Sequence, residues 1–144
     1  MLRRIHPVAG IIAFLTILTF WSSTVVAELF GSVETITFVK QAIPWGFLML
    51  VPALAITGAS GFWLAGTSSE PTIVRKKRRM PFIAGNGLLI LIPVALYLAR
   101  LASRGELNSL FYGVQAVELV AGAVNLTLMS LNIRDGLRLT GRLS

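Results

Sequence analysis

Four long apolar runs, separated by short polar segments, constrain this chain more than any other feature. They cover about residues 7–28, 43–65, 81–101 and 109–133. A helix needs about 20 mostly apolar residues to cross the hydrocarbon layer of a bilayer. A chain of 144 residues with four such runs has no room for a soluble domain. The sequence therefore predicts a single all-α domain, residues 1–144, folded as an up-down four-helix transmembrane bundle.

The composition excludes several classes of function. The chain is 55% hydrophobic and 13% charged, which is too apolar for an ordinary soluble domain. It has no cysteine, so disulfides, thiolate metal sites and a cysteine nucleophile are all excluded. It also lacks a phosphate-binding glycine loop, a zinc-binding carboxylate–histidine pattern and a serine–histidine–acid constellation. These absences argue against a hydrolase or an NTPase and favour a non-enzymatic role without deciding it.

The basic residues predict how the helices are oriented. Positive charge accumulates on the cytoplasmic side of bacterial membrane proteins, and the more basic side here holds both termini, so we expect both in the cytoplasm and the chain in the inner membrane. The net charge is +7, but basic residues that flank apolar runs suit anionic lipid better than nucleic acid. The cytoplasmic group comprises Arg3, Arg4, Arg134, Arg138, Arg142 and the block Arg75, Lys76, Lys77, Arg78 and Arg79.

Polar residues recur at every third or fourth position from Asn108 to Asp135, a spacing that places them on one helix face. Amides and a carboxylate facing hydrocarbon would each cost several kcal/mol. We therefore expect this stripe to face protein or water inside an assembly. A second polar stripe lies along one face of the third apolar run, from Asn86 to Arg104. The two predicted polar seams contain Gln115, Glu118, Asn125, Asn132, Asn86, Tyr97 and Arg100.

Glu118 is the candidate site residue nearest the middle of the membrane. It follows Asn108 by about ten residues, which is a depth of about 15 Å along a helix. We expect Arg100, Tyr97 and Gln115 beside it. One interpretation is a buried hydrogen-bonded pair that fixes the register of the last two helices. The other is a proton or substrate site.

Other polar residues are expected to have structural roles. Residues 30–42 are predicted to form an interfacial loop. Glu28 and either Lys40 or Arg100 lie at the same rim, where they would form at most a water-exposed surface pair. Asn86 and Asn125 sit at comparable depth on the last two helices, so they are expected to form an amide ladder together with Asn132, with a ligand site as the alternative.

His6 is the only histidine and precedes Pro7 at the head of the first helix. One interpretation is an interfacial residue that caps the helix or meets lipid headgroups. The segment from Ile5 to about Phe14 also resembles part of the b561-type membrane cytochromes, where such a histidine binds haem b. This resemblance implies that His6 is an axial haem ligand. The second ligand would be Met80, Met129 or the His6 of another copy, much as a partner chain supplies one in the membrane-anchor subunits of succinate dehydrogenase-like complexes.

As a whole, the chain resembles the small four-helix inner-membrane proteins of bacteria, a resemblance that implies no activity. Our first hypothesis is a non-enzymatic membrane subunit that forms homo-oligomers or docks into a larger membrane complex. It would do so through the polar stripe of the fourth helix and a small-residue face of the second, formed by Ala53, Thr57 and Gly61. The second hypothesis is a small b-type cytochrome or electron-transfer subunit with haem on His6. The third is a proton-coupled transporter that uses Glu118.

Overall fold

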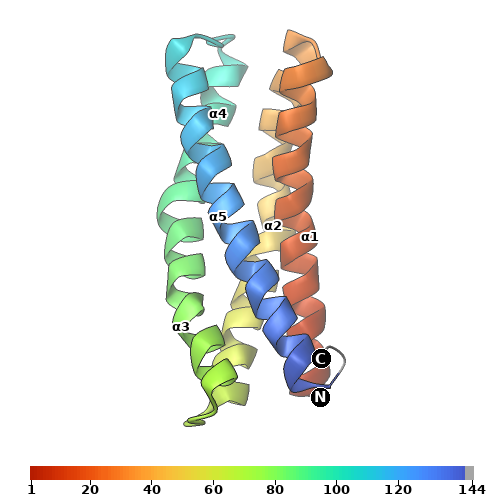
Figure 1. Cartoon of the computed structure of the whole chain (residues 1–144). Helices are drawn as coiled ribbons and strands as arrows, with labels where there is room; N and C mark the ends of the chain where they lie inside the picture. The colour runs from red at the N-terminus through yellow and green to blue at the C-terminus, as the bar shows by residue number, and fades with distance from the viewer. Residues whose placement is uncertain (142–144) are drawn as a thin grey trace.

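The computed structural model describes residues 1–141, which contain helices and no strand. Residue Arg142, included above among the cytoplasmic charges, lies outside this range. Three helices are followed by a π-helix, η1, which joins α3 to α4 in one continuous rod (Figure 1). The elements are α1 (Leu2–Phe30), α2 (Val33–Ala65), α3 (Pro71–Asn86), η1 (Gly87–Leu91), α4 (Ile92–Ser103) and α5 (Ser109–Leu139).

Four helical rods are long and apolar enough to cross a membrane, with α3, η1 and α4 counted as one rod. This confirms the predicted helical class and is consistent with a multi-pass membrane protein. The start of α1 and the end of α5 lie at the same end of the bundle (Figure 1). We call it the terminal end. The opposite end, which holds the connections 31–32 and 104–108, is the loop end.

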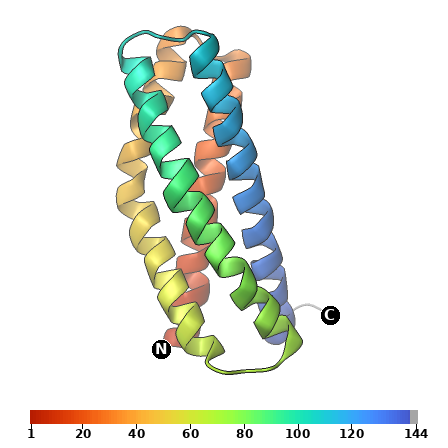
Figure 2. The same ribbon diagram turned by 90° about the vertical axis from the view of Figure 1, so that its left-hand side faces the viewer.

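The third rod crosses the bundle diagonally between α2 and α5 (Figure 2). Toward the loop end, α4 packs mainly against α2, whereas toward the terminal end α3 packs mainly against α5. The helix α1 lies along α2 and also contacts α5. This crossing closes the bundle at the loop end and separates its helices at the terminal end.

Side-chain caps define where the helices begin. Ser32 accepts a hydrogen bond from the Thr35 backbone N–H, and Asn108 accepts one from Phe111. Such caps satisfy backbone donors that the first turn leaves unpaired. Because Ser32 caps α2, which starts at Val33, most of the segment predicted to be an interfacial loop, residues 33–42, is helical and belongs to α2. Lys40 can enter the bundle there because a carboxylate neutralises it inside, as described below.

The π-helix η1 changes which face of the third rod points inward. The Ile92 N–H bonds the Gly87 carbonyl, five residues back, and Pro93 follows, where a normal helical bond would lack its donor. The wider turn shifts the helical phase by about one residue. After η1, Ala95 and Leu98 are buried and Arg100 is exposed. The prediction of one polar seam from Asn86 to Arg104 was therefore wrong beyond Gly87.

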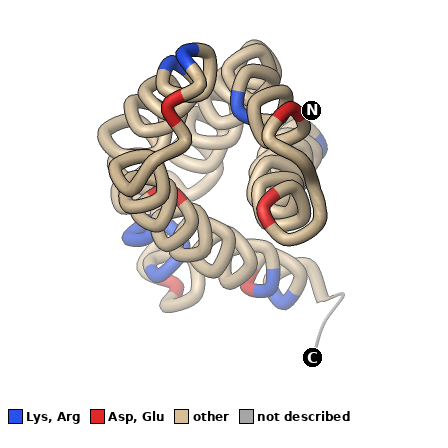
Figure 3. The backbone as a smooth tube through the Cα atoms, turned by 90° about the horizontal axis from the view of Figure 1, so that it is seen from above, with Lys and Arg blue, Asp and Glu red and all other residues tan. Residues whose placement is uncertain are grey.

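Two groups of buried apolar side chains hold the rods together, and large apolar side chains such as Trp45 and Leu89 cover the outside. Figure 3 shows most of the backbone free of charged residues. The loop-end core consists of Ala27, Ile36, Leu98, Leu101, Ala102 and Phe111, and the central core of Ala13, Ile17, Leu50, Ala53, Ile83 and Met129.

Candidate functional site

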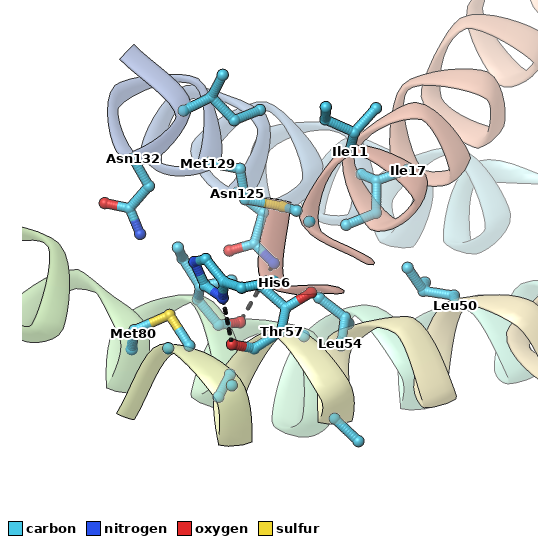
Figure 4. Close-up of a pocket in the computed structure, with 18 of the residues that line it drawn as sticks. His6, Ile11, Ile17, Leu50, Leu54, Thr57, Met80, Asn125, Met129 and Asn132 are labelled. Atoms are coloured by element: carbon cyan, nitrogen blue, oxygen red, sulfur yellow. Dashed lines mark hydrogen bonds between the residues drawn. The ribbon is translucent and has the colours of Figure 1, made fainter. Parts of the chain in front are cut away.

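A cavity of about 1340 Å³ lies among the helices and extends from the level of Thr24, Ile43 and Glu118 to the terminal end of the bundle. All four rods contribute to its walls, which are mainly apolar. Figure 4 shows His6 from α1, Thr57 from α2, Met80 from α3 and Met129 from α5 around it. The three residues that the haem hypothesis names, His6, Met80 and Met129, thus line one cavity.

The hydrogen bonds of His6 assign the protonation of its ring. Its Nδ1 atom lies 3.2 Å from the Thr57 carbonyl oxygen (Figure 4). The same atom lies 2.9 Å from Ser60 Oγ. The Ser60 hydroxyl already donates to the Ile56 carbonyl at 2.6 Å, so its oxygen is left to accept. Nδ1 therefore carries the proton and donates to α2. The lone pair of Nε2 has no hydrogen-bond partner among residues 1–141.

Gly61 allows the imidazole to lie against α2. A Cβ atom at this position would be 2.9 Å from His6 Cε1, whereas one at Gly58 would be 3.6 Å from Met80 Cε. Thr57, on the same face, lies opposite Gly10 of α1. The small-residue face expected to dock a partner is therefore occupied by α1 and α3 of this same chain.

Basic side chains line the terminal end of the cavity. Arg3 and Arg4 of α1 are exposed there, and Lys76 and Lys77 of α3 are half-buried. Within the part of the chain that the structure describes, His, Asp and Glu form no group of three that could hold a metal ion. The cavity therefore combines an apolar interior and one imidazole with a cationic rim.

Glu118 forms an ion pair that the sequence analysis did not anticipate. Its Oε1 atom accepts from Lys40 Nζ at 2.6 Å, and Lys40, only 1% exposed, also donates to Thr24 at 3.3 Å. The expected partners Arg100 and Tyr97 are exposed on the outer face of α4, because η1 rotates that face outward. The expectation that Lys40 forms only a surface pair was also wrong.

Gln115 lies on the loop-end side of this ion pair. It is 4% exposed and donates from Nε2 to Glu28 Oε1 at 2.8 Å. Its own Oε1 is buried and has no partner among the described residues. Gln115, Glu118 and Asn125 are all buried, so the inward orientation predicted for this stripe of α5 is confirmed.

The amides of half-buried Asn86 and buried Asn125 join the third rod to α5. Asn86 donates to Asn125 Oδ1 at 2.9 Å and to the Ala121 carbonyl at 2.8 Å, and Asn125 donates to the Ile83 carbonyl at 3.3 Å. The predicted amide contact between Asn86 and Asn125 is therefore present, although Asn132 is not part of it. Asn132 instead accepts from Arg79 at 3.0 Å.

The basic block is part of α3 and does not act as a uniform lipid-facing group. Arg79 donates to Asp135 at 2.8 Å, and the Asp135 side chain is fully buried. Arg75 and Arg78 are exposed, as a lipid-facing role requires. The Arg79–Asp135 pair fastens α3 to α5 at the terminal end.

Lys40, Thr57 and Ser60 are the site residues that sequence reasoning missed. The signal for Lys40 was available, because Ile36, Lys40 and Ile43 follow the same spacing of three and four as the other inward-facing residues of α2. Thr57 was assigned to the small-residue face and Ser60 was not singled out. Their contact with a histidine about fifty residues earlier is long-range and leaves no periodic signal.

The geometry allows two kinds of chemistry. The cavity can hold an apolar molecule with acidic groups, coordinated or hydrogen-bonded by His6 Nε2. The Lys40–Glu118 pair presents a carboxylate to that cavity, because Glu118 lines its wall. No protein-family model, no curated protein and no solved structure matches this chain.

Proposed function

We propose that the chain is a small electron-transfer protein of the bacterial inner membrane that binds haem b in the cavity through His6. The observation that carries this proposal is the fixed tautomer of His6. Its Nδ1–H donates to Thr57 and Ser60, and its Nε2 lone pair is left without a partner. Haem-ligating and metal-ligating histidines typically have this arrangement, in which a bond from the other ring nitrogen orients the ligand.

The remaining parts of the cavity fit the chemistry of haem. The apolar walls suit the macrocycle, and Arg3, Arg4, Lys76 and Lys77 at the terminal end suit its two carboxylates. The thioether of Met80 or Met129 is a candidate second ligand, and His6 of a second copy is the other. Bound haem would supply one-electron transfer.

The proposed topology places the terminal end in the cytoplasm. Arg3, Arg4 and the basic block of α3 all lie at that end, which accords with the positive-inside rule. In this orientation Arg75 and Arg78 would meet anionic lipid, and the basic rim of the cavity would face the cytoplasmic leaflet.

The docking hypothesis has less support than haem binding. The polar stripe of α5 bonds other helices of the same chain, and the small-residue face of α2 packs against α1 and α3. A homo-oligomer enters the proposal only as a source of the second haem ligand.

The test is a haem-binding measurement on His6→Asn. Asparagine keeps a side-chain N–H that can donate to Thr57 but offers no imidazole nitrogen to iron. Purified wild-type protein supplied with haem should show a Soret band, and the variant should lose it while keeping its helical circular dichroism. A colourless wild-type protein at full haem supply would refute the proposal.

Gly61→Ala and Gly58→Ala form a matched pair on one face of α2. The first methyl group would meet the His6 ring at 2.9 Å and displace it, whereas the second would make an ordinary contact with Met80 at 3.6 Å. We expect haem affinity to fall about tenfold, about 1.4 kcal/mol, in Gly61→Ala. It should stay near wild type in Gly58→Ala. Equal affinities in haem titrations would show that the imidazole is not the ligand.

A further inference from the structure

A series of buried polar groups leads from the loop end of the bundle to the cavity. Glu28 is half-buried near the end of α1, and Gln115 and Glu118 follow at increasing depth on α5. Glu118 lies about 14 Å from the start of α5 at the usual helical rise. Because Glu118 also lines the cavity, which reaches the terminal end, the series and the cavity together extend along the whole bundle.

The buried oxygen of Gln115 marks an incomplete position in this series. Gln115 Nε2 donates to Glu28, which assigns the orientation of the amide, and Oε1 of the same amide has no donor among residues 1–141. A buried acceptor left without a donor costs about 1–3 kcal/mol. A water molecule commonly satisfies such a group.

The surroundings of this oxygen suit a bound water. Gln115 and Glu118 are three residues apart on α5, so their side chains are neighbours on one face. Lys40 Nζ has three protons, of which Thr24 and Glu118 accept two. A water on Gln115 Oε1 would sit at the amide that bonds Glu28, on the face of α5 that also carries Glu118.

We infer that Glu28, a water molecule held by Gln115, and Glu118 form a proton path between the loop end of the bundle and the cavity. A proton from solution converts the Glu28 carboxylate to the acid. Glu28 passes this proton to the water, which gives one of its own protons to Glu118 and stays neutral. Glu118 releases the proton to water in the cavity and returns to the carboxylate paired with Lys40.

The charges around Glu118 support this role. Lys40 from α2 is the cation in contact with it, and Glu28 from α1 accepts from Gln115, three residues before Glu118 on α5. On α4, Arg100 and Tyr97 are exposed and make no contact with Glu118 within the described range. A single ammonium therefore balances Glu118, so the pair is neutral at rest and carries one positive charge while a proton passes.

The experiment measures proton flux in vesicles of phosphatidylcholine and phosphatidylglycerol that contain the protein purified without haem. A potassium gradient with valinomycin drives protons, and an enclosed pH-sensitive dye reports them. The wild type should conduct protons faster than empty vesicles. Glu118→Gln and Gln115→Leu should both fall to the rate of empty vesicles. Glu106→Gln, an exposed carboxylate at the same end of the bundle, should keep the wild-type rate.

Each outcome decides the inference independently of haem. A wild-type rate equal to that of empty vesicles overturns it, and so does normal flux in either path variant. If Glu118→Gln fails to fold, the double variant Lys40→Met/Glu118→Leu removes both charges together, which buried ion pairs tolerate better. Loss of flux in the folded double variant supports the path, as does its loss in Gln115→Leu, which changes no charge.

Discussion

The two halves of the bundle use the same four rods in opposite ways. In the loop-end half, Leu98, Leu101 and Phe111 fill the space between the helices, and none of the loop-end core lines the cavity. Beyond this core the rods leave a cavity, and Ile17, Leu50 and Met129 of the central core form part of its walls. The diagonal third rod produces this difference, since α4 packs on α2 while α3 packs on α5 (Figure 2).

This difference assigns stability mainly to the loop-end half of the bundle and ligand binding to the terminal half. A site is more precise when rigid elements support it, and the packed loop-end half can hold the helix ends while the terminal half leaves room for a ligand. The Lys40–Glu118 pair lies at the boundary between the two halves. It fastens α2 to α5 and presents a carboxylate to the cavity.

The largest expected effect comes from separating this ion pair. Lys40→Met leaves Glu118 buried without its partner, which should destabilise the protein by about 3–5 kcal/mol, as for other broken buried pairs. The double variant Lys40→Met/Glu118→Leu should recover most of that loss. Unfolding in mixed detergent would measure the free energy of unfolding of both variants. A Lys40→Met protein as stable as wild type would mean that the ion pair does not fasten α2 to α5.

Truncating one side chain in each core should sharpen the contrast between the halves. Phe111→Ala opens a hole in the packed loop-end core and should cost about 3 kcal/mol, the low end for such a change because lipid rather than water surrounds the separated helices. Met129→Ala only enlarges an existing cavity and should cost about 1 kcal/mol. Equal losses in the same unfolding assay would show that the terminal half is packed as tightly as the other.

The smallest effect concerns the start of α3, which supplies Lys76 and Met80 to the open half. Glu70 caps this helix by accepting the Ile73 N–H, and that hydrogen bond holds the pKa of the carboxyl below its usual value. A lowered folded pKa means that the cap stabilises the protein above the unfolded pKa and loses this effect as pH falls through the folded value.

Glu70→Gln should therefore flatten the acid side of the stability profile without affecting the loop-end half. Melting temperatures between about pH 6 and about pH 3 would test this, with Glu106→Gln as the exposed control. An unchanged profile would mean that the Glu70 cap contributes nothing to the open half.

Spacing along single helices was sufficient to predict the helices and the inward face of α5. Side chains spaced three or four residues apart lie on one face of a helix wherever that helix is placed. Gln115, Glu118 and Asn125 could therefore be assigned to the interior from the sequence. For the third rod, the same reasoning gave a wrong prediction of the inward face. It assumed a regular helix through Gly87, and the extra residue of η1 moved Tyr97 and Arg100 to the outside.

Partners across helices were decided by the tertiary structure. Lys40 and Glu118 are 78 residues apart, and their contact depends on the rotation of α2 and α5 about their axes. Likewise, the sequence identified His6 as the lone histidine, but only the packing of α1 on α2 fixes its tautomer through Thr57 and Ser60. The sequence by itself determined four apolar rods and an interior polar face, because both follow from local periodicity. Long-range packing decides which charges meet and where the rods separate to leave a cavity. No local pattern in the sequence encodes that packing.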